Sequence, residues 1–197
     1  VALSATSQKM RATYDTNSSR AVCVYSDDNQ SDDGYAVVVS VSGTTPTFGS
    51  AVEFSTVNCL TLDCCFDSNS NKVVVAYKAS DQGRSKVGTV SGTSISFGTE
   101  QSLTQAGGDL RSAAVFDSST NEIILVIEAA TTNFATVIKG SISGTSFFAG
   151  VATVVAEINI VVGGIVYDED TNQCIFSFQD DNNYDGKHVV FNSANPS

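Results

Sequence analysis

The chain has 197 residues, of which 42% are hydrophobic and 16% charged, and its formal net charge is −11. Ten Lys and Arg residues argue against nucleic-acid binding, which needs clustered basic side chains, and the charge disfavours anionic membranes. No segment approaches the ~20 apolar residues of a membrane span, so we expect no membrane insertion. The chain starts at Val1 without a signal-peptide pattern, which we interpret as a processed product or part of a longer protein.

Four segments repeat one pattern, in which an aromatic residue is followed by Asp, a short polar stretch and an apolar run. They start at Tyr14, Phe66, Phe116 and Tyr167, at spacings of 52, 50 and 51 residues. A period near 50 indicates supersecondary units that bury their surfaces by stacking on one another. We expect a single domain over 1–197, with repeats at about 11–61, 62–111, 112–162, and 163–197 plus 1–10.

The first predicted element is a strand at residues 1–6, which aligns with residues 51–56, the fourth strand of the first unit. The last element, residues 187–191, aligns with the third strand of that unit. The last unit must therefore be completed by the N-terminal strand, either of its own chain or of a neighbouring copy. Because an unpaired strand edge is a template for pairing, we predict that copies associate through strand edges or unit rims. The predicted self-assembly residues are Val1, Ala2, Leu3, Ser4, Ala5 and Thr6.

Two acidic loops are the candidate metal sites. The candidate ligands alternate along the chain before a glycine: Asn29, Ser31 and Asp33 in the first repeat, and Asp181, Asn183 and Asp185 in the last. Oxygen ligands at this spacing resemble the first half of a calcium loop. Neither loop has a Glu at its twelfth position, and such loops also suit solvent-exposed hairpins. Calcium is the candidate cofactor, and plain hairpin turns are the alternative.

The second repeat shows the organisation of a unit. Apolar runs at 59–67 and 71–78 are joined by a polar turn, and runs at 86–91 and 94–103 are joined by Gly92-Thr93. Glycine adopts positive φ without steric cost, as tight hairpins require. No window keeps a 3.6-residue apolar period, so each unit is predicted to form four short antiparallel strands without helix.

The second strand of each unit is apolar on both faces. In the second repeat Val73, Val75 and Tyr77 alternate with Val74 and Ala76. A half-exposed sheet would alternate apolar with polar residues, whereas a propeller blade is covered on both sides by other sheets. We therefore predict an all-β, four-bladed β-propeller whose last blade is split between the N- and C-termini. A β-solenoid, or an arc of blades from a larger ring, is the alternative.

The hairpins at residues 39–49, 87–99 and 139–150 share a Ser-Gly-Thr turn between short β-rich runs. They resemble repeats of β-propeller proteins found in phage tail fibres and bacterial surface appendages. The resemblance covers essentially the whole chain and carries over no functional residue. It implies an extracellular, cell-surface or virion location.

No catalytic constellation can be assembled from the sequence. His188 is the single histidine, and no phosphate loop, HExxH motif or dinucleotide fingerprint occurs. The five cysteines occupy or flank apolar strand positions without metal-site spacing, so we interpret them as core residues. We expect no enzyme activity.

The predicted function is a non-enzymatic structural building block of an extracellular or virion-associated appendage, fibre or filament, with copies of itself as partners. The alternative is a lectin-like propeller that binds glycans and mediates adhesion. The chain has no Trp, and among the aromatics considered only Tyr184, in an acidic loop, falls outside the core pattern. A hydrolase with its site on the loops is the third interpretation.

Overall fold

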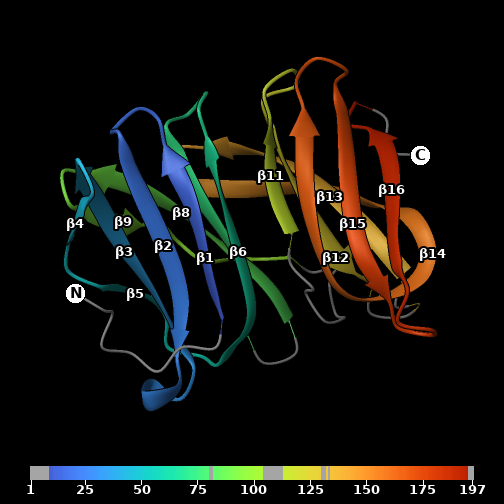
Figure 1. The fold of residues 1–197 in the computed structure, drawn as a ribbon, viewed down its shortest axis with the longest axis horizontal. Coiled ribbons are helices and arrows are strands. Elements are labelled where there is room, and N and C mark those ends of the chain that lie inside the picture. Colours follow the sequence, from blue (N-terminus) through green and yellow to red (C-terminus); the bar gives the residue numbers. More distant parts are fainter. Residues whose placement is uncertain (1–8, 80–81, 104–112, 130–131, 133, 195–197) are drawn as a thin grey trace.

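The computed structural model describes residues 9–79, 82–103, 113–129, 132 and 134–194, and its fold is shown in Figure 1. Every strand pair in it is antiparallel, and the helical structure in these residues is one 3-10 turn at Asp28–Gln30. The prediction of an all-β protein built from antiparallel strands is confirmed. None of the described helical structure is long and apolar enough to cross a membrane.

Four antiparallel sheets follow one another in the order of the four repeats. Sheet A consists of β1 (Met10–Asp15), β2 (Arg20–Asp27), β3 (Asp33–Ser42), β4 (Thr45–Phe48) and β5 (Val52–Ser55). Sheet B consists of β6 (Cys59–Asp67), β7 (Lys72–Ala79), β8 (Gln82–Ser91), β9 (Ser94–Phe97) and β10 (Gln101–Ser102). Sheet C consists of β11 (Ala113–Asp117), β12 (Glu122–Glu128), β13 (Phe134–Ser143) and the first part of β14 (Ser146–Asp168). Sheet D consists of the second part of β14, β15 (Gln173–Asp180) and β16 (Gly186–Asn192).

Strand β14 differs from the sequence-based prediction, because the expected repeat boundary at residue 162 lies inside it. Its first part pairs with β13 and its second part with β15, with a register shift between Ile160 and Gly163. A side chain at Gly163 would lie 2.5 Å from the Phe176 ring, so glycine allows β14 to pass close to β15. The chain thus crosses from sheet C to sheet D along one irregular strand instead of through a loop.

The repeated Asp builds the turn between the first two strands of each sheet. In sheet B, Asp67 accepts hydrogen bonds from the Asn69 N–H at 2.8 Å and from the Ser70 hydroxyl at 2.7 Å. The same two bonds, to the residues two and three further on, recur at Asp15, Asp117 and Asp168. The residue after each set has φ of 55–56°, and it is Asn in three of the four turns, since Asn tolerates this conformation well. The repeated motif is therefore a hairpin-forming motif.

The sheets stack face to face in the order A, B, C, D. The three buried layers between them are centred on Val22, Val24, Val73, Val75 and Tyr77 for A and B, on Val74, Ala76, Ile123, Leu125 and Ile127 for B and C, and on Ile124, Val126, Cys174, Phe176 and Phe178 for C and D. Sheets B and C are thus covered on both faces, as the sequence pattern predicts.

Sheets A and D lie at opposite ends of the long axis of the molecule (Figure 1). The described residues form an open stack of four sheets, and a ring closed by contact between sheets A and D is not seen among them. The closed four-bladed propeller stays a prediction. The strand expected at Val1–Thr6 lies outside the described residues.

Candidate functional site

Among the described residues, three crevices lie at equivalent places, each between the outer strand of one sheet and the face of the next. Glu53 and Arg84 line the crevice between sheets A and B, Gln101 and Phe148 the crevice between B and C, and Ile158 and His188 that between C and D. The stacking of similar sheets therefore creates the crevices, and the residues at their walls decide what each could bind.

The A–B crevice contains a charged network. The Tyr77 hydroxyl donates to Glu100 Oε2 at 2.5 Å, and the Arg84 guanidinium pairs with Glu100 Oε1. Burial alone would raise the pKa of Glu100, but the hydrogen bonds from Tyr77 and Arg84 outweigh it and lower that pKa. Glu100 is therefore ionised at neutral pH and already accepts hydrogen bonds from two donors. Because Tyr77 lies on β7 and Arg84 on β8, Glu100 connects these strands to the segment between β9 and β10, which is a structural role.

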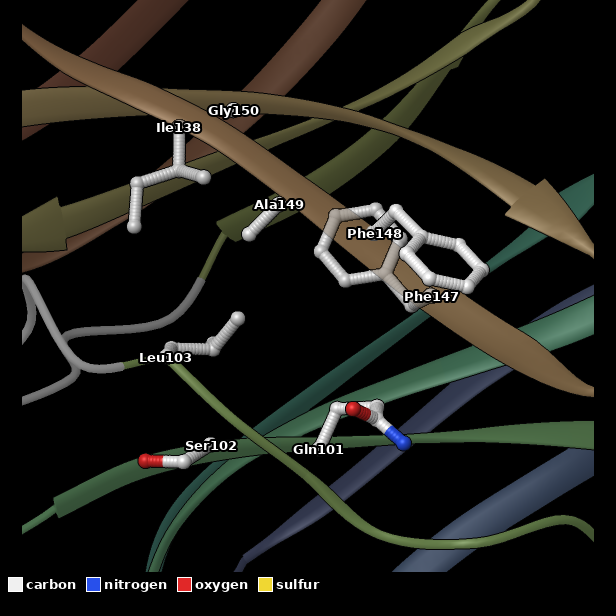
Figure 2. A pocket seen from close by; sticks show the side chains of 8 residues that line it. All are labelled: Gln101, Ser102, Leu103, Ile138, Phe147, Phe148, Ala149 and Gly150. Atoms are coloured by element: carbon white, nitrogen blue, oxygen red, sulfur yellow. The ribbon is translucent and has the colours of Figure 1, made fainter.

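The described residues that line the B–C crevice are uncharged, and the crevice has a volume of about 200 Å³ (Figure 2). Figure 2 shows Gln101 and Ser102 on one wall and the rings of Phe147 and Phe148 on the strand across from them. Leu103 follows β10 and is held by a hydrogen bond from its N–H to the Gly83 carbonyl at 2.8 Å. Buried apolar side chains form the floor: Leu103, Ile138 and Phe147.

Phe148 is the unusual residue of this crevice, because its side chain is 59% exposed. Strand alternation directs Phe147 inward and Phe148 outward. Ser96 and Thr47 occupy the position of Phe148 in the hairpins of the second and first repeats. Sequence reasoning missed this residue because Phe-Phe resembles core; comparing it with Ser96 and Thr47 would have identified an aromatic ring at a solvent position.

The chemistry of the B–C crevice is that of an apolar ring next to neutral hydrogen-bonding groups. The Gln101 amide offers two donors and an acceptor, and the Ser102 hydroxyl can donate and accept. Such walls match a ligand with one apolar face and hydroxyl groups at its edge.

A depression of about 370 Å³, separate from the three crevices, lies where the first strands of sheets A, B and C come together. The repeated aromatics Tyr14, Phe66 and Phe116 line it, together with Glu169. Beside it, Asp63 Oδ2 accepts a hydrogen bond from the Ala114 N–H at 2.9 Å, and the carboxylate lies 3.9 Å from the Arg11 guanidinium. Burial raises the pKa of Asp63, and its partners connect β6 to β11 and β1, so we assign it a cross-linking role.

The structure places the predicted calcium ligands of the last repeat on the exposed β15–β16 loop. The Asn183 side-chain amide donates to Asp185 Oδ2 at 2.7 Å, and the Asp185 N–H donates to Asn183 Oδ1 at 3.1 Å. The neighbouring Asp180 pairs with Lys187 Nζ at 2.5 Å, and that hydrogen bond is the main cause of its lowered pKa.

The predicted ligands of the first repeat lie on the β2–β3 loop. Asn29 donates its backbone N–H to Asp27 Oδ1 at 3.0 Å, Ser31 has φ of 59°, and Asp33 begins β3. The two acidic loops belong to sheets A and D, so the structure does not bring them together (Figure 1). Within the described residues, no group of three or more His, Cys, Asp or Glu side chains could hold a metal ion. Calcium binding by the mixed Asn, Asp and Ser sets stays a prediction.

The cysteines and the histidine occupy positions close to those expected. Cys59, Cys64, Cys65 and Cys174 are buried free thiols, and Cys23 is half-buried. Burial raises the pKa of Cys59 to about 11 and that of Cys174 to about 12, so both thiols stay protonated at neutral pH. His188 is exposed on β16, where it lines the C–D crevice.

Comparison with known proteins shows a likeness of fold to solved structures. No protein-family model and no curated protein matches the chain. A similar solved structure is the exo-β-1,3-galactanase of Phanerochaete chrysosporium, crystallised with β-1,3-galactotriose. The TM-score is 0.56 at 10% sequence identity, and the match covers 92% of this chain and 46% of that one. The chain therefore spans about half the length of that protein, and the likeness shows the fold alone.

Proposed function

We propose that the chain is a carbohydrate-binding protein of propeller-type architecture, and that the B–C crevice holds one sugar ring. The observation that carries the proposal is that Phe148 is exposed at the rim of the crevice that Gln101 and Ser102 also line. A sugar ring has an apolar C–H face, which would lie against the phenyl ring, and hydroxyl groups at its edge, which would bond to the amide and hydroxyl. The sequence alone indicated only Tyr184 as an exposed aromatic ring on which a sugar could stack. Phe148 is another exposed aromatic ring, and it supports the lectin-like alternative.

The size of the crevice limits the ligand and its affinity. At about 200 Å³ it is smaller than the roughly 300–1,000 Å³ typical of drug-sized sites, so it suits a single small ring. With one stacking surface and two polar side chains, we expect a dissociation constant of about 0.1–1 mM per site. The galactanase, which is similar in fold, was crystallised with a galactose trisaccharide, so a protein of this fold can bind a sugar. It supports the proposed ligand class in this way alone.

We propose binding without cleavage. Glycoside hydrolysis ordinarily uses two carboxyl groups flanking the scissile bond, one of which acts as an acid with a raised pKa. Among the described residues that line the B–C crevice there is no carboxylate. In the A–B crevice Glu100 has a lowered pKa, which is opposite to the need of a general acid.

A glycan array probed with the labelled protein displayed in several copies on a carrier, so that avidity offsets the weak single-site affinity, tests the proposal. We expect binding to galactose-containing or related neutral oligosaccharides, lost in Phe148→Ala and retained in Phe148→Trp, which keeps an aromatic face. Val151→Ala, at another exposed position of β14, is the matched control and should bind as the wild type does. Equal binding by wild type and Phe148→Ala, or no binding to any glycan, would contradict the proposal.

A structural role in an extracellular or virion-associated appendage is the second candidate function. It is favoured by the apolar outer faces of sheets A and D, which are partly exposed at the two ends of the stack. The two functions are compatible, since a fibre that carries glycan-binding crevices would mediate adhesion.

A further inference from the structure

Sheet D ends the stack with a row of exposed apolar side chains. Ile175 lies seven residues after the turn Asp of its repeat, and Val22, Val74 and Ile124 occupy that position in the other repeats. Those three are 0% exposed, each buried against the next sheet, whereas Ile175 is 37% exposed. Its cross-strand neighbours Val166 and Val190 are also exposed, so an apolar row crosses all three strands of sheet D.

Sheet A begins the stack with the opposite kind of face. Tyr14 is 56% exposed, whereas Phe66, at the same position of sheet B, is 9% exposed beneath sheet A. Met10 is likewise exposed where the equivalent Leu62 is buried. On β2 and β3 this face is already buried at Tyr25 and Val37. The exposed part of the face is therefore the strip along β1.

The two open faces are the two halves of a contact that the chain makes three times internally. At each junction, the sheet face that holds Val22, Val74 or Ile124 packs on the opposite face type of the following sheet, which holds Val73, Ile123 or Cys174. Sheet D presents an unmatched face of the first type, which holds Ile175, and sheet A presents an unmatched face of the second type, which holds Tyr14. We propose that the sheet D face of one copy docks on the sheet A face of a second copy and continues the stack.

This contact is heterologous, because it joins two different surfaces of identical chains. Heterologous contacts close into rings when the rotation per copy allows it and otherwise extend into filaments. The exposed residues of the two faces, Val166, Ile175 and Val190 on sheet D and Met10 and Tyr14 on sheet A, are uncharged. The net charge of −11 therefore lies outside the contact, where it makes two copies repel each other. Added salt should therefore strengthen association, because it screens that repulsion. The proposal uses sheet faces instead of strand edges, and it does not depend on sugar binding.

Sedimentation and light scattering over a range of protein concentrations, at low and high salt, test the proposal with the full chain. The wild type should show a mass that rises with concentration and with salt. Val166→Asp and Val190→Asp place a charge in the sheet D row and should be monomeric, as should Tyr14→Asp on sheet A. Val151→Asp makes the same change at an exposed position outside both faces and should associate as the wild type does. Circular dichroism and thermal melts establish that each variant is folded.

A mixing experiment identifies the head-to-tail geometry. Tyr14→Asp retains an intact sheet D face, and Val166→Asp retains an intact sheet A face, so an equimolar mixture should form a dimer of twice the 20.6 kDa chain mass and nothing larger. A mixture that stays monomeric while the wild type associates would refute this pairing. A wild type that is monomeric at high concentration and high salt, or a Val151→Asp variant that dissociates like the others, would overturn the proposal.

Discussion

Removal of the Asp117 carboxylate should destabilise the protein more than any other single change in a turn. The side chain is buried and accepts the N–H groups of Ser119 and Thr120 at 2.8 and 3.2 Å and their hydroxyls at 2.7 and 2.6 Å. A hydrogen bond to a charged group contributes about 1.5–3 kcal/mol net, and water can replace part of each bond in a turn, so we expect Asp117→Ala to cost about 3 kcal/mol. In a chain of this size that lowers Tm by about 6–12 °C.

Asp117→Asn keeps the Oδ1 acceptor for both backbone N–H groups and should cost about 1 kcal/mol. The control Asp170→Ala makes the same Asp-to-Ala change at an exposed turn position and should lie within about 0.5 kcal/mol of wild type. Thermal and urea unfolding followed by circular dichroism measure these differences. An Asp117→Ala variant that melts with the control would refute the assignment of the repeated Asp as the turn-forming residue.

The same carboxylate gives a pH dependence of defined sign. Burial would raise the pKa of Asp117, but hydrogen bonds from Thr120, Ser119 and Ser193 lower it well below its ordinary value. A carboxyl whose folded-state pKa is depressed stabilises the protein above its unfolded pKa of about 3.9, and this stabilisation is lost as pH falls toward the folded pKa. The stability difference between wild type and Asp117→Asn should therefore shrink between pH 5 and pH 2. A constant difference would show that the charge of Asp117 contributes nothing.

Three further predictions concern packing, thiols and the acidic loops. Gly140→Ala should destabilise by about 1–3 kcal/mol, because its Cβ would lie 2.5 Å from a phenyl ring and a backbone oxygen, whereas Gly186→Ala, with nothing within 4 Å, should melt as the wild type does. Cys174→Val should cost less than about 1.5 kcal/mol, and a thiol reagent at neutral pH should modify Cys23 before the four buried cysteines; loss of folding in the valine variant would indicate a missed role. If the acidic loops bind calcium, a chelator should lower Tm and Asp185→Ala should abolish that effect, whereas identical melts would leave the loops as hairpin turns.

Most of the secondary structure could be predicted from the repeat period, because each turn is determined by residues that are close together in the sequence. The aromatic-Asp pattern marks a hairpin whose hydrogen bonds lie within four residues, so its position follows from the sequence alone. The double-sided apolar pattern of the second strands likewise predicts sheets covered on both faces, as in sheets B and C. Ile175 looks the same in sequence as Ile124, yet one is exposed and the other buried, because exposure depends on the next sheet in the stack.

The candidate site was less predictable, because it forms between sheets. Gln101 and Phe148 are 47 residues apart and meet only when sheet B packs on sheet C. Their residue types carry no catalytic or metal-binding motif that a sequence search could recognise. The one usable signal was local, namely a phenyl ring at a position that holds Thr in the first repeat and Ser in the second.

A crystal structure of the protein with the oligosaccharide that binds best on the array tests the central claim most directly. The account predicts a sugar ring in the B–C crevice, with its C–H face against Phe148 and its hydroxyl groups bonded to Gln101 and Ser102. A sugar found instead in the depression beside Tyr14 or on the acidic loops, with the B–C crevice unoccupied, would contradict it.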